Sequence, residues 1–134
     1  MKILIVDDHD YVPDGLKMWI AAFWPPEVPP EVVTALCSSA DLAIEAVKDY
    51  QPDVLFLDYS FGGRDRKTGK DVALWIDRNY QKPIRVATHS SHYNVRELFS
   101  GAECVKHFIS GISDTEHIKK FIEHCTGRKV TNGY

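Results

Sequence analysis

The sequence predicts an α/β protein: a doubly wound, three-layer domain with a five-stranded parallel sheet and five helices. Two observations lead to this prediction: short apolar runs alternate with segments of helical period, and the connections between them are short. Strict alternation of this kind favours a parallel sheet, because each crossover places a helix on one face. The chain has 134 residues, the size of one ordinary domain.

Five apolar runs are predicted to be strands. The first and third consist almost entirely of Ile, Leu, Val and Phe, as expected for central parallel strands buried on both faces. The predicted strands are Lys2–Val6, Val32–Leu36, Val54–Leu57, Ile84–Ala87 and Cys104–Ile109.

Five segments with apolar residues at helical spacing lie between and after these strands. The first carries Leu16 and Ile20 on one face, with Pro13 in its first turn, where a missing N–H costs nothing. The fourth starts near Ser91 and is short. Caps are predicted at Ser38 or Ser39 for the second helix, at Thr68-x-x-Asp71 for the third and at Ser113-x-x-Glu116 for the fifth.

Composition excludes several classes of protein. Hydrophobic residues make up 44% and charged residues 26%, as in soluble globular domains. No apolar run approaches the roughly 20 residues that span a bilayer, and the first residues lack the pattern of a signal peptide. Three cysteines without a C-x-x-C pair favour a reduced compartment, and the net charge of −3 argues against nucleic-acid binding. We expect a cytoplasmic protein that contacts neither membrane nor nucleic acid.

Three acids stand where predicted strands end. Asp7 and Asp8 follow the first strand, and Asp58 follows the third. If these strands are neighbours, the carboxylates converge and repel one another, and a hard divalent cation such as Mg²⁺ is the usual remedy. Thr88 ends the fourth strand and Lys106 lies in the fifth. A carboxylate, Mg²⁺, a hydroxyl group and a lysine ammonium group together suit phosphoryl transfer. The simpler alternative is that these acids are solvated loop residues or helix caps without a chemical role.

Two other candidate sites are not supported. The polar loop Gly62–Lys70 suggests a phosphate-binding loop, but Arg64 and Asp71 stand where that motif needs glycine and a hydroxyl residue. Four histidines lie in separate segments without ligand spacing, which does not favour a Zn²⁺ site: His9, His89, His92 and His107.

Nearly the whole chain resembles the receiver domain of two-component response regulators. The matching stretches are Ile3–Asp8, Gln51–Asp58, Pro83–Thr88 and Gly101-Ala102, in the expected order. The resemblance implies a flavodoxin-like fold and transfer of a phosphoryl group to Asp58 from a histidine kinase or phosphotransfer protein. It also implies that Mg²⁺ is held by Asp7, Asp8, Asp58 and the backbone carbonyl of Ser60. Thr88 and Lys106 would contact the phosphoryl group.

The chain departs from this family at several positions. Gly62 stands where proline is usual, and the next suitable glycine, Gly69, comes three residues late. An ungapped alignment places Phe108 at the family's lysine position. We prefer Lys106 there, because a phenylalanine would leave the phosphoryl charge without its cation. Val105 replaces the usual switch aromatic.

The residue after the threonine also differs, since His89 replaces a small residue. An outward orientation is favoured for this histidine over a hydrogen bond to the phosphoryl group.

We therefore expect residues 1–126 to form a receiver domain and residues 127–134 a flexible tail or linker stub. The domain would be a signalling switch that catalyses its own phosphorylation and dephosphorylation, not a turnover enzyme. Its output would pass to a downstream protein or to an effector domain removed from this chain. The alternative is a receiver-like adaptor that binds partners without phosphorylation. An aspartate-nucleophile phosphatase is disfavoured, because Ser60 stands where that chemistry needs a second Asp.

Overall fold

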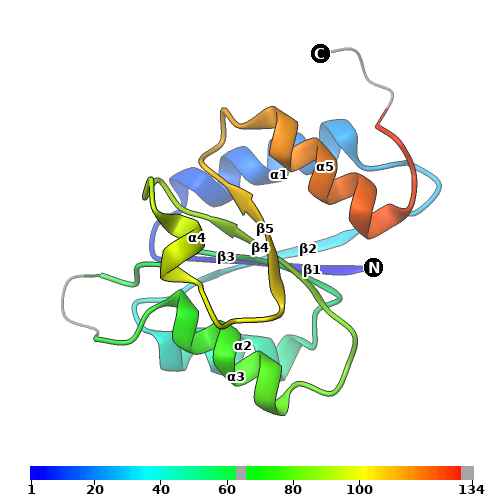
Figure 1. The fold of residues 1–134 in the computed structure, drawn as a ribbon. Coiled ribbons are helices and arrows are strands. Elements are labelled where there is room, and N and C mark those ends of the chain that lie inside the picture. The colour runs from blue at the N-terminus through cyan, green and yellow to red at the C-terminus, as the bar shows by residue number, and fades with distance from the viewer. Residues whose placement is uncertain (63–65, 131–134) are drawn as a thin grey trace.

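The computed structural model describes residues 1–62 and 66–130, and its centre is a five-stranded parallel sheet. The strand order is β2-β1-β3-β4-β5, so β2 is added on one side of β1 and the later strands on the other side (Figure 1). This order confirms the predicted doubly wound sheet and places β1 and β3 side by side at its centre. The strands are β1 (Lys2–Asp7), β2 (Glu31–Leu36), β3 (Val54–Leu57), β4 (Arg85–His89) and β5 (Val105–Ile109).

Helices cover both faces of this sheet, as Figure 1 shows. Helices α1 and α5 lie on one face, and α2 and α3 lie on the other. The helices are α1 (Tyr11–Phe23), α2 (Ala40–Tyr50), α3 (Gly69–Asn79), α4 (Val95–Leu98) and α5 (Thr115–Thr126). The expectation of a short fourth helix is confirmed, since α4 has four residues. No helix within the described ranges combines the length and apolar character needed to cross a membrane.

Two apolar clusters, one on each face of the sheet, form the core. Alternate residues of β1 belong to opposite clusters, because successive strand side chains point to opposite faces. Ile5 faces α1 and α5, whereas Val6 faces α2 and α3. In the cluster on the α1 and α5 face, the rings of Phe56 and Phe121 pack edge to face with centroids 5.1 Å apart. Because β1 and β3 are buried on both faces, the residues that follow them are held on a rigid base.

Two of the three predicted helix caps are confirmed and one is wrong. Ser39 caps α2, and Thr68 with Asp71 forms the predicted box before α3. The cap of α5 is Asp114 instead of Ser113, and it accepts hydrogen bonds from the N–H groups of Ser110 (2.9 Å) and His117 (3.4 Å). A carboxylate has two acceptor oxygens, so it can serve N–H groups on both sides of the turn.

Parts of two segments singled out in the sequence lie outside the described residues: 63–65 of the loop Gly62–Lys70, and 131–134 of the predicted tail. The described part of the tail is attached to the domain. The Val130 N–H donates to Glu123 Oε2 over 2.8 Å, and Val130 packs against the core cluster beside α1 and α5. The flexibility predicted for residues 127–134 stays a prediction.

Candidate active site

Asp7 and Asp58 meet at the edge where β1 and β3 end. These strands pair in parallel with Val6 opposite Leu57, so the residue after each pair faces the same edge. Both acids line a hollow of about 260 Å³. Its full lining is Asp7, Asp8, His9, Tyr11, Val12, Asp58, His89, Ser91, Ser110 and Gly111. The sequence-based expectation that these acids converge is therefore met.

The carboxyl of Asp58 is half-buried in this hollow. Burial raises the pKa of Asp58 to about 7. The negative charges of Asp7 and Asp8 also push this pKa upward, while His89 opposes them. The Tyr59 N–H donates to Asp58 Oδ1 over 2.8 Å, which leaves the second oxygen free to face a ligand.

Asp7 is more deeply buried and is paired with His89. His89 Nε2 donates to Asp7 Oδ2 over 2.9 Å, and the His9 N–H donates to Asp7 Oδ1 over 3.1 Å. Burial alone would raise the pKa of Asp7, but these hydrogen bonds outweigh burial and the pKa is lowered. His89 Nδ1 has no hydrogen-bond partner within the described residues. The imidazole thus makes its polar contact with the acid cluster alone.

The inward position of His89 corrects the expectation that it points outward. Thr88 pairs with Leu57, so the next residue of β4 aligns with Asp58. Because strand side chains alternate, His89 then lies on the face of the sheet that carries Asp7 and Asp58. Knowledge of this register would have predicted that His89 points toward the acids. The register is set by pairing between distant strands, so the sequence pattern alone does not give it.

Asp8 occupies the outer part of the site. Its side chain is 20% exposed and lies 3.7 Å from His9 Nε2. Burial raises the pKa of Asp8, and the neighbouring Asp7 carboxyl adds to this effect. Three carboxylates are therefore gathered as predicted, with Asp8 nearest to solvent.

Thr88 and Ser60 do not line the hollow. Thr88 is fully buried, and its Oγ1 has no hydrogen-bond partner within the described part of the chain. Ser60 is exposed, and its Oγ lies 3.4 Å from His92 Nε2. Their roles toward a phosphoryl group and a metal ion stay predictions.

The structure does not bring Lys106 to the acids. The pairing of β4 with β5 skips this residue, since Val86 pairs with Val105 and Ala87 with His107. Ile109 is the residue opposite His89, so Lys106 lies about 10 Å back along the strand at about 3.3 Å per residue. Lys106 is exposed and lines a separate hollow of about 140 Å³ with Arg85 and His124.

The other alignment, with Phe108 at the lysine position, fits the strand register better. Phe108 pairs with Thr88 near the carboxyl edge of the sheet. Its half-buried ring lies 4.5 Å from the guanidinium carbon of Arg96. No lysine is among the described residues that line the acidic hollow.

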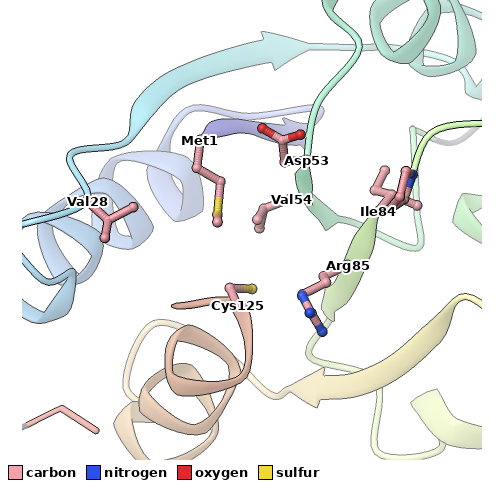
Figure 2. Close-up of a pocket in the computed structure, with 8 residues that line it drawn as sticks. Met1, Val28, Asp53, Val54, Ile84, Arg85 and Cys125 are labelled. Atoms are coloured by element: carbon pink, nitrogen blue, oxygen red, sulfur yellow. The ribbon is translucent and has the colours of Figure 1, made fainter. Parts of the chain in front are cut away.

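A larger hollow of about 620 Å³ lies at the opposite edge of the sheet, where β3 and β4 begin. Figure 2 shows Asp53 and Val54 on one side of it, with Arg85 and Cys125 across from Asp53. Asp53 is already paired with Lys82 Nζ at 2.9 Å. This hollow lacks the converging carboxylates of the site at the carboxyl edge.

The donor atoms at the carboxyl edge suit a divalent cation. Asp7, Asp58 and His89 each offer one ligand atom, and these atoms lie within 4.8 Å of one another. Carboxylate oxygens are the ligands that Mg²⁺ prefers, and burial, with the neighbouring acids, raises the pKa of Asp58. The residues present therefore fit such an ion.

A doubly wound sheet with acids at the ends of two adjacent central strands is the architecture of a receiver domain. A family model described as the cyclic-phosphate processing receiver domain matches residues 1–103. The chain therefore belongs to this family of receiver domains.

Solved structures share the flavodoxin-like fold. The response regulator TrrA of Thermotoga maritima, solved with Mg²⁺-BeF, is 18% identical with a TM-score of 0.72 over 92% of this chain and 97% of that one. The receiver domain of NtrX from Brucella abortus is 25% identical with a TM-score of 0.70, over 95% of this chain and 99% of that one.

A curated relative extends beyond the receiver domain. The probable transcriptional regulatory protein NarL of Mycobacterium tuberculosis is 25% identical over 132 residues. That match covers 97% of this chain and 57% of the relative, so the chain spans less than two thirds of its length.

Proposed function

We propose that this domain accepts a phosphoryl group on Asp58 from the phosphohistidine of a histidine kinase or phosphotransfer protein. The observation that carries the proposal is the convergence of Asp7, Asp8 and Asp58 in one hollow at the carboxyl edge. TrrA, which shares the fold, was solved with Mg²⁺ and the phosphoryl mimic BeF, and this supports the proposal.

The free oxygen of Asp58 is the nucleophile. It forms a bond to phosphorus while the P–N bond of the donor breaks, and the donor imidazole keeps the electron pair. Asp7, Asp8, Asp58 and the Ser60 carbonyl would hold Mg²⁺, which offsets negative charge on the transferring group. The Tyr59 N–H orients Asp58 by holding its other oxygen. Thr88 would donate its hydroxyl to the bound phosphoryl group.

The modified domain would act as a switch in the cytoplasm. Phosphorylation adds charge beside β1 and β4 and shifts an existing equilibrium between two conformations. The signal would reach a downstream protein or an effector domain through protein contacts. Hydrolysis of the aspartyl phosphate would reset the switch.

Mass spectrometry of the intact chain after incubation with phosphoramidate and Mg²⁺ tests this proposal. We expect one added phosphoryl group, absent with Asp58→Asn or EDTA. Asp53→Asn is the matched control, since Asp53 lies at the opposite edge, paired with Lys82. If no adduct forms and beryllofluoride with Mg²⁺ does not change thermal stability, the adaptor without phosphorylation is the better description.

One observation favours a second function at the same site, hydrolysis of a cyclic phosphate. A dianionic phosphoryl group is usually neutralised by an ammonium group, but among the described residues the basic side chains that line this hollow are two histidines, His9 and His89. A cyclic phosphodiester carries a single negative charge and needs less compensation. Water would attack phosphorus, one ring P–O bond would break, and the released oxygen would take up a proton. The matching family is described as cyclic-phosphate processing, which supports this second function.

Phosphorus NMR separates the two functions. With a 2′,3′-cyclic nucleotide and Mg²⁺, the second function predicts a phosphomonoester product that is lost in Asp58→Asn. An aspartyl phosphate formed from phosphoramidate, with the cyclic nucleotide left intact, contradicts hydrolysis and supports the phosphoacceptor.

A further inference from the structure

The cluster at the carboxyl edge contains a nitrogen ligand as well as oxygen ligands. The side chains of His89 and Asp7 are 1% and 6% exposed, so packing holds them in place. His89 Nδ1 has no hydrogen-bond partner within the described residues, and its Nε2 points at Asp7. The imidazole is therefore directed into the site.

The spacing within this pair is also that of two neighbouring metal ligands. His89 Nε2 and Asp7 Oδ2 are 2.9 Å apart. Nitrogen and oxygen ligands bind small divalent ions at about 2.1 Å, and two such bonds at a right angle place their atoms about 3.0 Å apart. A cation can thus replace the shared proton if the imidazole tilts toward it, because an ion bound to both atoms lies to one side of the line that joins them.

Asp58 can complete the set. The ligand atoms of the three residues lie within 4.8 Å of one another, and opposite ligands of an octahedral ion are about 4.2 Å apart. Since Asp7 and His89 would occupy neighbouring positions, Asp58 must come within about 3.0 Å of at least one of them, which requires a shift of at most about two ångströms. All three residues line the hollow of about 260 Å³, whose rim includes the exposed Tyr11, so an ion can enter from solvent.

We infer that Asp7, Asp58 and His89 form a mixed nitrogen–oxygen centre that binds a divalent transition-metal ion more tightly than Mg²⁺. Mg²⁺ strongly prefers oxygen ligands, whereas imidazole suits Co²⁺, Ni²⁺ and Zn²⁺. The inference rests on the proposed function, because it concerns the metal of the same site. It assigns His89 the role of a ligand.

Calorimetric titration of the metal-free full chain with Co²⁺ and Mg²⁺ tests the inference. We expect Co²⁺ to bind at least about tenfold more tightly, and His89→Asn to lower Co²⁺ affinity by about tenfold or more while changing Mg²⁺ affinity much less. His124→Gln is the matched control, because His124 lies on α5 near the opposite edge, beside Arg85. It should leave both affinities unchanged.

Pulsed EPR of the Mn²⁺-loaded wild type gives a second readout that does not require a folded His89 variant. Coupling to an imidazole nitrogen supports the inference, and its absence overturns it. If Mg²⁺-dependent phosphorylation of Asp58 proceeds but Co²⁺ and Mg²⁺ bind equally, the inference fails while the proposed function stands. If neither metal binds and Asp58 is not modified, both fail.

Discussion

Gly69 lies against the backbone carbonyl of Asp58, so closely that an added Cβ would overlap the carbonyl oxygen. The Gly69 N–H also donates to Tyr59 O over 2.7 Å. The first residue of α3 thus supports the chain just after β3, where the candidate nucleophile stands. The late glycine noted in the sequence is required by this contact.

Replacing Gly69 with alanine should therefore disturb both stability and the site. We expect Gly69→Ala to lower the free energy of unfolding by about 1–3 kcal/mol, since backbone atoms must move to admit the methyl group. Urea denaturation measures the loss. Gly111→Ala is the control, because a Cβ there meets nothing within 4 Å. Equal stability of the two variants would contradict the close contact.

The cap of α5 predicts a pH-dependent loss of stability. Burial would raise the pKa of Asp114, but hydrogen bonds from the Ser110 N–H and His117 lower it below the ordinary 3.8. A lowered pKa contributes stability that is present above the unfolded value and lost as the pH falls through the folded value. Asp114→Ala should cost about 1 kcal/mol at pH 7, and this difference should shrink below about pH 4.

Denaturation at pH 7 and pH 3 measures this effect. Ser113→Ala is the matched control, because the sequence predicted Ser113 as the cap and Asp114 has that role. A larger loss in Ser113→Ala than in Asp114→Ala would restore the sequence-based assignment.

Asp58 predicts the opposite pH dependence in the metal-free protein. Its pKa of about 7 lies above the ordinary 3.8, so its contribution to stability is complete below about pH 4 and is lost as the pH rises through 7. In EDTA at pH 8, Asp58→Asn should be more stable than the wild type. The gain is at most about 4 kcal/mol, since each tenfold change in proton affinity corresponds to about 1.4 kcal/mol.

At pH 4 the two proteins should be nearly equal, because Asp58 is then uncharged. Asp53→Asn should behave differently, since hydrogen bonds from the Lys2 N–H and Lys82 outweigh burial and lower the pKa of Asp53. A wild type as stable as Asp58→Asn at pH 8 would show that burial does not penalise the charged form of Asp58.

Lys106 should be dispensable for chemistry at Asp58. Because it is exposed and lines a different hollow, Lys106→Gln should take up phosphoryl groups from phosphoramidate within about twofold of the wild-type rate. The exposed Lys48→Gln, at a residue paired with Glu45 on α2, provides the comparison. A large loss in Lys106→Gln alone would mean that β5 adopts another register on phosphorylation.

The sequence by itself determined the layers of this domain and the position of its acids. The apolar runs that became β1 and β3 are buried on both faces, so they had to lie at the centre of a parallel sheet. Once they were neighbours, Asp7 and Asp58 had to meet at their ends. The residue types and the spacing of apolar residues were enough to predict the layers of the domain and the convergence of these acids.

Only the tertiary structure decided which basic group reaches the acids. The irregular pairing at Lys106 and the alignment of His89 with Asp58 are matters of strand register. A shift of one residue moves a side chain to the other face of the sheet. Register depends on contacts between strands far apart in the chain, which is why local pattern favoured Lys106 and the folded domain places His89 beside Asp7.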